Sequence, residues 1–190
     1  MRVIAGKARG RRLNAPRGMN TRPATARVRA SIFSRLEARG LVQGAGVLDI
    51  FAGSGSLGLE AMSRGGSEAV FVDSSREAGA AITRNLREFG LEARARVIIA
   101  DFRRALAQLS AEACHFGLIL IDAPFADDST AEVLALIARL GLLAPNGCVV
   151  TRQFHRVAAP AAAEYECINV ARIGDHRIAL YRRLDSGAPR

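Results

Sequence analysis

The chain has few cysteines and no long run of apolar residues. Cys114, Cys148 and Cys167 are odd in number and far apart, without the paired spacing of a metal site or a disulfide framework. We expect them to be buried free thiols, and we expect no bound metal. Residues 1–7 hold no apolar core of signal-peptide length, and no later run is long enough to span a bilayer. These absences predict a cytoplasmic protein without a membrane partner.

Acidic residues are scarce at the amino end of the chain. The 190 residues carry a net charge of +9, with a hydrophobic content of 49% that is ordinary for one globular domain. Before Gly40, Glu37 is the only acidic residue among eleven basic ones. The basic residues are Arg2, Lys7, Arg9, Arg11, Arg12, Arg17, Arg22, Arg27, Arg29, Arg35 and Arg39. This local excess favours a nucleic acid as partner over the alternative of a merely solvated basic surface.

Residues 1–40 are predicted to form a basic extension that binds RNA. Residues 2–5 and 11–14 have the pattern of two short strands, which predicts a small hairpin. A helix is expected from Thr25 to Gly40, with one apolar face that leaves its arginines on the other faces. The apolar face consists of Val28, Ile32, Phe33 and Leu36. The predicted RNA contacts are Arg9, Arg11, Arg12, Arg22, Arg27 and Arg29.

Strands and helices alternate over residues 41–185. Strands are predicted over 47–51, 69–72, 96–100, 116–121 and 148–152, and helices over 57–64, 76–89, 102–109 and 130–142. Residues 165–173 and 177–183 are predicted to form an antiparallel pair joined through Gly174-Asp175. The pattern predicts an α/β fold with a mostly parallel, seven-stranded sheet and an antiparallel carboxyl-terminal pair.

A glycine-rich turn joins the first of these strands to its helix. Gly53 and Gly55 permit a tight turn, and the N–H groups of the new helix point at whatever binds there. The spacing Gly53-x-Gly55-x-x-Gly58 also matches the fingerprint of nicotinamide dehydrogenases. Asp49 argues against that class, because its carboxylate would repel a pyrophosphate. It suits a ligand that carries a cation, such as S-adenosylmethionine.

Each of the first four predicted strands ends in an aspartate or reaches one immediately. These aspartates are Asp49, Asp73, Asp101 and Asp122. Because ligands of open parallel sheets bind at the carboxyl ends of the strands, the four point to one site. Asp73 is expected to bind ribose hydroxyls or to cap a helix. Asp101 is expected to contact adenine, to cap the helix that follows, or to do both.

The segment Asp122-Ala123-Pro124-Phe125 suits a flat amine. The Asp122 carboxylate and the Ala123 carbonyl can accept the two N–H bonds of an exocyclic amine, and Phe125 can stack on an extruded base. The alternative is a plain turn in which Asp122 acts as a cap. Such an amine is a poor nucleophile, since its lone pair is delocalised into the ring, so two acceptors would direct its nitrogen at a methyl group.

These residues resemble the class I S-adenosylmethionine-dependent methyltransferases, and more narrowly the bacterial 16S ribosomal RNA guanine-N2 methyltransferases, the RsmD family. The resemblance covers nearly the whole chain and includes residues 2–6, 9–13, 21–23, 27–29, Phe33 and 49–61. It implies a Rossmann-like fold, S-adenosylmethionine as cofactor, and a monomer acting on one guanine of 16S rRNA, free or within the small subunit. It implies cofactor contacts around Asp49, Phe51, Gly53, Ser54, Gly55, Asp73, Asp101 and Phe102. It implies catalysis at Asp122, Ala123, Pro124 and Phe125.

The chain departs from the family pattern at three positions. Ala26 and Ala30 stand where an acid is usual, and Ala123 replaces the first proline of the catalytic motif. The backbone carbonyl survives this last change and Pro124 still favours an extended Ala123, but some rigidity is lost. Two alternatives stay open: a catalytically weakened homologue that binds RNA, and a methyltransferase acting on adenine N6.

Overall fold

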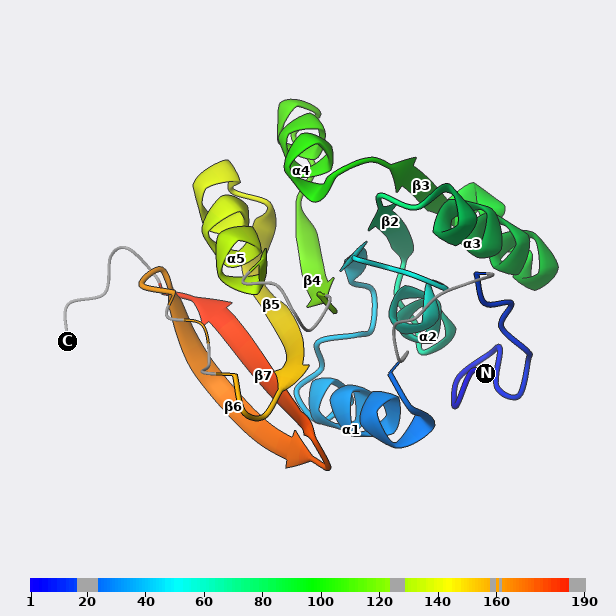
Figure 1. Cartoon of the computed structure of the whole chain (residues 1–190), viewed down its shortest axis with the longest axis horizontal. Helices are drawn as coiled ribbons and strands as arrows, with labels where there is room; N and C mark the ends of the chain where they lie inside the picture. Colours follow the sequence, from blue (N-terminus) through cyan, green and yellow to red (C-terminus); the bar gives the residue numbers. More distant parts are fainter. Residues whose placement is uncertain (17–23, 124–128, 158–159, 161, 185–190) are drawn as a thin grey trace.

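The computed structural model describes residues 1–16, 24–123, 129–157, 160 and 162–184. A seven-stranded sheet crosses the molecule with the order β3-β2-β1-β4-β5-β7-β6 (Figure 1). The strands are β1 (Gly46–Ile50), β2 (Glu68–Asp73), β3 (Ala95–Ile99), β4 (Phe116–Ile121), β5 (Leu143–Phe154), β6 (Tyr165–Ile173) and β7 (His176–Arg183). Strands β1 to β5 are parallel, and β7 is antiparallel to both β5 and β6. The predicted sheet is confirmed.

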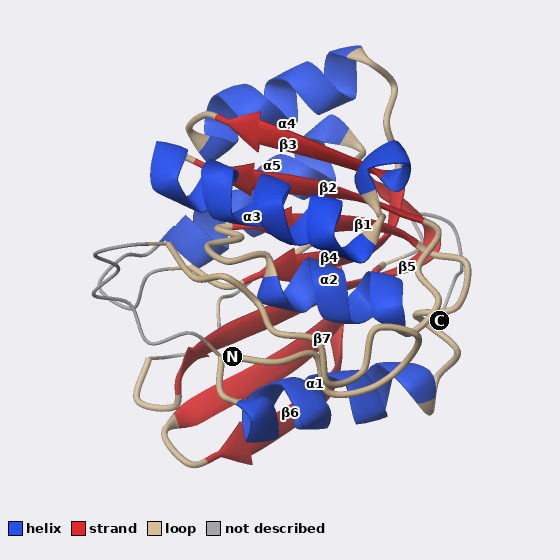
Figure 2. Cartoon of the chain, turned by 90° about the vertical axis from the view of Figure 1, so that its right-hand side faces the viewer, coloured by secondary structure: helices blue, strands red, loops and turns tan. Residues whose placement is uncertain are grey.

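Helices cover both faces of the sheet. The helices α1 (Ala26–Glu37), α2 (Ser56–Ser63) and α3 (Arg76–Phe89) pack on one face, and α4 (Phe102–Ala111) and α5 (Ser129–Leu140) pack on the other (Figure 2). A short 3-10 helix, Glu92–Arg94, precedes β3. Along β4, Leu118 and Leu120 join one buried cluster while Ile119 and Ile121 join the other, as strand alternation requires. In the described part of the chain, no helix combines the length and apolar character needed to cross a membrane.

Local signals explain why two elements have the bounds that the sequence predicts. Helix α3 begins after Ser75, whose hydroxyl accepts the N–H of Ala78, and ends at Gly90, whose φ of 66° suits glycine. Strand β4 is a continuous apolar run that is buried on both faces. Where a strong cap or an unbroken apolar run is present, local chemistry is sufficient to place the element.

Three expectations need correction. The two amino-terminal strands are shorter than expected: Arg2 and Arg12 form an antiparallel bridge flanked by cross-strand backbone bonds, whereas Ile4 and Ala5 bond to Glu60 of α2. Strand β5 begins at Leu143, five residues before the expected start at Cys148. The cysteines are free, but only Cys148 is buried, and Cys167 is exposed on the edge strand β6.

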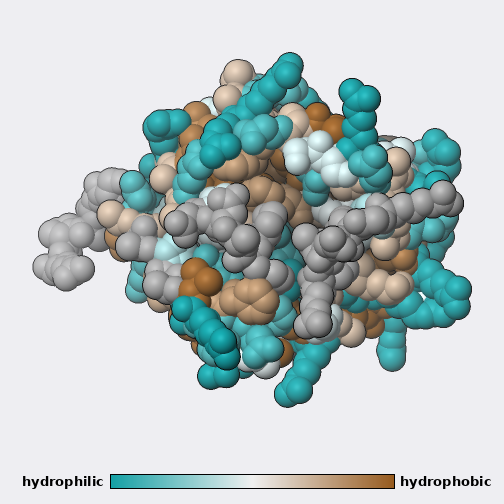
Figure 3. Space-filling model, in the orientation of Figure 1, coloured by the Kyte–Doolittle hydropathy of each residue, from teal (hydrophilic) through white to brown (hydrophobic). Residues whose placement is uncertain are grey.

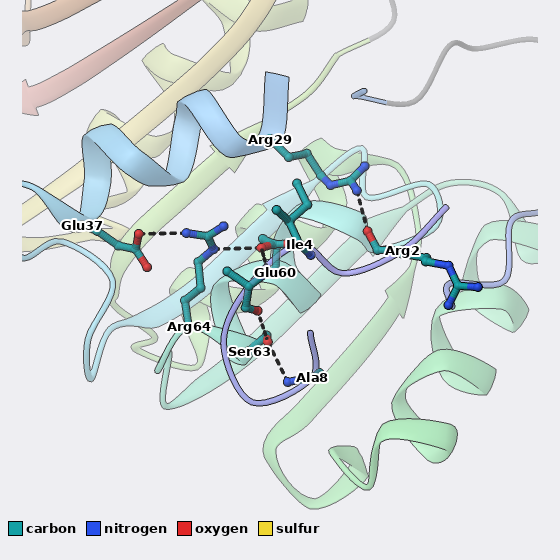
Figure 4. A network of polar contacts seen from close by, with 9 residues as sticks. Arg2, Ile4, Ala8, Arg29, Glu37, Glu60, Ser63 and Arg64 are labelled. Carbon is teal, nitrogen blue, oxygen red and sulfur yellow. Dashed lines mark hydrogen bonds and ion pairs between the residues drawn. The ribbon is translucent and has the colours of Figure 1, made fainter. Parts of the chain in front are cut away.

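The amino-terminal segment is held against the carboxyl-terminal half of α2 (Figure 4). The fully buried Glu60 accepts the N–H groups of Ile4 and Ala5 at 2.8 and 3.0 Å. Ser63 accepts the N–H of Ala8 and donates to the Ala5 carbonyl. Gly6 has a φ of 79°, and a Cβ there would lie 1.9 Å from the Ser63 carbonyl oxygen. The segment is therefore an integral part of the fold.

Candidate active site

The carboxyl ends of β1 and β4 lie side by side, and the chain leaves them in opposite directions. From β1 it continues to β2 and β3, whereas β4 is followed by β5 on the other side. Helix α2 follows β1 on one face of the sheet, and α5 follows β4 on the other. Such a switch point opens a crevice outside the strand ends, which is where open α/β sheets bind ligands. Asp49, the glycine turn and Asp122 all lie at this place in the topology.

The glycine turn has an unusual backbone. Phe51, Gly53 and Gly55 have φ values of 61°, 56° and 73°, in the left-handed region that a residue such as Phe51 rarely adopts. Gly58 lets α2 approach the sheet, because a Cβ there would lie 2.4 Å from the Phe71 ring. The turn therefore carries backbone strain where the sequence predicts a cofactor, a common property of functional sites.

Asp49 is buried beneath this turn, with 1% of its surface exposed. Its carboxylate accepts the N–H of Gly58 at 2.8 Å, within the first turn of α2. Burial raises the pKa of Asp49 well above its usual range, the Gly58 N–H opposes this, and the charges of Asp122 and Asp73 raise the pKa further. The charges of Asp122 and Asp73 thus disfavour the ionised form of Asp49, and a bound cation would offset this effect.

Asp73 connects the glycine turn to the end of β2. One carboxylate oxygen accepts the N–H of Gly53 at 2.8 Å, and the other accepts the N–H of Ser75 at 2.9 Å. The N-cap of α3 is Ser75, so Asp73 is not the helix cap that was the alternative to ribose binding; it holds the glycine turn instead, beside its expected role at the ribose. A carboxylate oxygen can accept more than one bond, so the two roles are compatible.

Asp101 and Phe102 lie at the start of α4. Asp101 is the N-cap and accepts the N–H of Arg103 at 2.9 Å. Phe102 is buried and packs against Phe51, with the ring centroids 5.4 Å apart and the rings tilted by 59°. This aromatic pair joins the strained turn after β1 to the amino end of α4, so both predicted cofactor elements meet.

Asp122 follows β4 and pairs with Arg152 of β5. The Arg152 Nε donates to Asp122 Oδ1 at 2.5 Å, and both side chains are largely buried, with 4% and 14% exposed. The Arg152 Nη1 also lies 3.5 Å from His176 Nδ1 on β7. Burial raises the pKa of Asp122, while Arg152 and His176 lower it to a smaller extent. Burial and then Arg152 lower the pKa of His176.

Arg152 is a site residue that the sequence did not reveal. It ends the apolar run of β5, and its partner lies thirty positions earlier in the chain. The register explains the pair, since Ile121 lies opposite Thr151 and the next residues of the two strands are Asp122 and Arg152. Ala123 is also buried, with 5% exposed. The predicted residues Pro124 and Phe125 lie outside the described residues.

The predicted RNA-binding arginines differ in their surroundings. Arg9, Arg12 and Arg27 are exposed, and Arg11 lies over the Phe89 ring at 4.5 Å. Arg29 is 1% exposed and donates to the carbonyls of Ala24 and Arg2, so the expectation that it lies on an open face is wrong. Arg22 lies outside the described residues.

On the face drawn in Figure 3, hydrophilic side chains lie around the rim and apolar ones gather towards the middle.

Residues 1–182 match the sequence model of a family described as "Conserved hypothetical protein 95". The chain is 36% identical over 160 residues to the "Putative rRNA methyltransferase YlbH" of Bacillus subtilis, covering 84% of this chain and 86% of that protein. It is 33% identical over 149 residues to the "Ribosomal RNA small subunit methyltransferase D" of Escherichia coli K12, covering 78% and 72%. A solved structure called "Putative methyltransferase yhhF from Escherichia coli" superposes with a TM-score of 0.82 at 30% identity over 96% of this chain and 97% of that one.

Proposed function

Because the chain belongs to the family described as "Conserved hypothetical protein 95", the RsmD family of S-adenosylmethionine-dependent methyltransferases, we propose that it methylates the N2 amine of a guanine in 16S ribosomal RNA. The observation that carries the proposal is the buried Asp122–Arg152 pair beside the glycine turn. This pair holds the Asp122 carboxylate in a fixed position beside the crevice in which we propose that the cofactor binds. The proposal implies that the protein works where ribosomal subunits are made, in the cytoplasm.

The residues around the switch point fit S-adenosylmethionine. The buried Asp49, whose ionised form the charges of Asp122 and Asp73 disfavour, suits a ligand that carries positive charge. The amino end of α2 suits a carboxylate, Asp73 suits ribose hydroxyls, and Asp101 with the Phe102 ring suits an adenine. When bound, this cofactor supplies an electrophilic methyl group on a sulfonium.

The chain's own residues would hold and direct the target amine. The Asp122 carboxylate accepts one N–H of the amine and the Ala123 carbonyl accepts the other, which aims the nitrogen lone pair at the methyl group. Arg152 occupies Asp122 Oδ1 and limits the rotation of the carboxylate, so it is a positioning residue. A buried carboxyl next to a guanidinium stays ionised more readily than one without it.

The proposal assigns RNA binding to residues 1–40 and methyl transfer to residues 41–185. The exposed arginines Arg9, Arg11, Arg12 and Arg27 are the proposed phosphate contacts, and Arg29 is left out of this set. An adenine-N6 specificity and a catalytically weakened RNA-binding role are the alternatives, because Ala123 departs from the usual motif.

Labelled methyl transfer tests the proposal. Unmodified 16S rRNA and unmodified small subunits are each incubated with the protein and labelled S-adenosylmethionine, and the nucleosides are then analysed by mass. We expect N2-methylguanosine, its loss in Asp122→Ala, and cofactor affinity in that variant close to wild type. Methyladenosine would support adenine specificity instead. Cofactor binding without transfer to either substrate would support the weakened homologue.

Reversing the charge of three arginines tests the RNA surface. The triple change of Arg9, Arg11 and Arg12 to Glu should weaken RNA binding and flatten its dependence on salt, because fewer counterions are released. The control is the cofactor affinity of the double variant of Arg9 and Arg12, which keeps the contacts of Arg11 with Phe89 and Glu88 and should stay within about twofold of wild type. Unchanged RNA affinity with an unchanged salt slope would place the RNA surface elsewhere.

A further inference from the structure

Asn85 connects the amino-terminal segment to the glycine turn. It lies on α3 and is fully buried, with 0% of its surface exposed. Its Nδ2 donates to the Asn14 carbonyl and to the Ser54 carbonyl, each at 3.0 Å. Its Oδ1 accepts the Asn14 backbone N–H at 2.7 Å and the Asn14 Nδ2 at 3.0 Å. One side chain therefore joins three distant parts of the sequence.

The arrangement requires an amide side chain. Both hydrogens of Nδ2 are used on backbone carbonyls, and Oδ1 accepts from the amino-terminal segment. An aspartate of the same shape has no donor and would place its charge against the carbonyls of Asn14 and Ser54. Because the site is buried, those carbonyls cannot turn to water without opening the structure.

Ser54 lies at the centre of the strained turn, between Gly53 and Gly55. Hydrogen bonds from within the turn and from other elements hold it. Gly53 donates to Asp73, Gly55 donates to the Ala52 carbonyl, and the Ser54 carbonyl accepts from Asn85. The Asn85 contact is the one of these that reaches the amino-terminal segment.

The same segment carries the exposed arginines. Arg11 lies over the Phe89 ring and donates to the Glu88 carbonyl, and Asn14 Nδ2 also lies 3.1 Å from the Glu88 carboxylate. Residues 11–14 are thus anchored on the last two turns of α3, next to Asn85. The other anchor of the segment, Ser63, lies at the far end of α2.

We propose that Asn85 is a positioning residue that makes the amino-terminal segment part of the cofactor site, by holding the Ser54 carbonyl and residue 14 in one network. The proposal rests on the proposed function, in that the glycine turn is taken to bind S-adenosylmethionine. Cofactor that binds the ordered turn stabilises it, and through Asn85 this stabilisation reaches residue 14. Cofactor binding and the order of the basic segment are therefore linked.

Hydrogen exchange of the wild-type protein tests this link without any substitution. The Asn14 amide donates to Asn85, and the Ala8 amide donates to Ser63, so the two amides report the two anchors of the segment. Adding S-adenosylhomocysteine as the probe should slow exchange at Asn14 by roughly tenfold and leave Ala8 within about twofold. Equal protection of both amides, or protection of neither, overturns the proposal.

Calorimetry of two variants completes the test. Asn85→Asp should bind S-adenosylhomocysteine roughly tenfold more weakly than wild type, since it loses two buried donors. Ser63→Ala is the matched control, because it loosens the same segment at its other anchor and should leave affinity within about twofold of wild type. An unchanged affinity in Asn85→Asp overturns the role of Asn85 alone. Absence of binding by the wild-type chain overturns the cofactor assignment as well.

Discussion

Asp49 and Glu60 are both buried carboxylates at helix α2: Asp49 of β1 lies against the first turn of the helix, and Glu60 belongs to its carboxyl-terminal half, in opposite surroundings. Glu60 accepts the N–H groups of Ile4 and Ala5 and pairs with the Arg64 Nε at 2.8 Å. Asp49 accepts the Gly58 N–H and is surrounded by the charges of Asp122 and Asp73, and no ion pair of Asp49 occurs among the described residues. Glu60 thus has a cationic partner where it holds the amino-terminal segment, whereas Asp49 has none among the described residues at the turn that we propose binds the cofactor.

This contrast separates a structural acid from a functional one by a physical criterion. A buried charge with hydrogen bonds and a cation adds specificity to the fold, whereas a buried charge without a cation costs stability until one arrives. The chain just after Asp49 also carries strain at Phe51, whose φ is 61°, whereas Gly53 and Gly55 adopt left-handed angles without strain. Both features are expected where stability is exchanged for binding.

Glu60→Ala should remove the contacts that hold the amino-terminal segment on α2, and it should give the largest loss of stability among these substitutions. It leaves two backbone N–H groups without their acceptor and removes a partner of Arg64, so the free energy of unfolding should fall by about 3 kcal/mol. Urea denaturation measures the change. Glu60→Gln is the control, because its oxygen still accepts, and it should lose less. A loss below about 1 kcal/mol in Glu60→Ala would mean that the segment is held by its other contacts.

Asp49→Asn should remove the buried carboxyl group, which should raise the stability of the protein and weaken its binding of the cofactor. The pKa of Asp49 is raised, so the folded state holds a proton that the unfolded chain releases, and wild-type stability falls as pH rises from the ordinary carboxyl range through the raised pKa. The variant should lose this slope and unfold at a higher temperature at pH 7. It should bind S-adenosylmethionine roughly tenfold more weakly, since a cationic ligand favours the ionised form of Asp49, which asparagine cannot provide.

Melting curves at several pH values and calorimetry measure these two effects. Asp73→Asn is not a suitable control, because Asp73 holds the glycine turn through Gly53. Glu60→Gln is a suitable control, since it neutralises a buried acid away from the glycine turn that we propose binds the cofactor. If Asp49→Asn binds the cofactor as tightly as wild type, the ligand's charge does not act on this carboxylate.

Arg152→Met should remove the ion pair of Asp122 and leave it a buried carboxyl group like Asp49. Without the guanidinium the pKa of Asp122 rises further, so the acidic limb of the methyl-transfer rate should move to higher pH by about one unit. The facing charged or titratable groups are His176 on β7 and Asp49 on β1, and the pKa of His176 should rise in the variant as well. The pH profile of kcat measures the shift. Arg152→Lys keeps the positive charge, so its pH profile should shift less. If both variants shift the profile equally, the shift comes from lost packing and not from lost charge.

Ala123→Pro, in the segment proposed to bind the target amine, should give the smallest effect of these substitutions. Proline keeps the carbonyl and restricts φ, so the variant should transfer methyl at least as fast as wild type. It should also gain about 0.4–1 kcal/mol of stability through the unfolded chain. Single-turnover transfer and a thermal melt measure both quantities. A stable variant that binds cofactor but transfers far more slowly would contradict the role given to the Ala123 carbonyl.

Local patterns were enough for much of the fold and for part of the site. The bounds of α3 and β4 follow from a cap, a terminal glycine and an apolar run. The glycine turn and the acids at the strand ends follow from the strand-turn-helix pattern. The amino-terminal hairpin is shorter than predicted, because Ile4 and Ala5 bond to Glu60 of α2, which local sequence does not show. The open position of Arg29 was wrong, because Arg29 donates to the carbonyls of Ala24 and Arg2.

The sequence by itself determined which residues form strands and helices, that glycines interrupt the chain after β1, and that four strands lead into carboxylates. Periodicity, capping and backbone freedom act over a few residues, so the sequence displays them directly. Only the tertiary structure decided which charges are balanced. Arg152 reaches Asp122 across the sheet, and Asn85 joins Asn14 to Ser54. These pairings depend on strand order and helix packing, which arise from the burial of the whole chain at once.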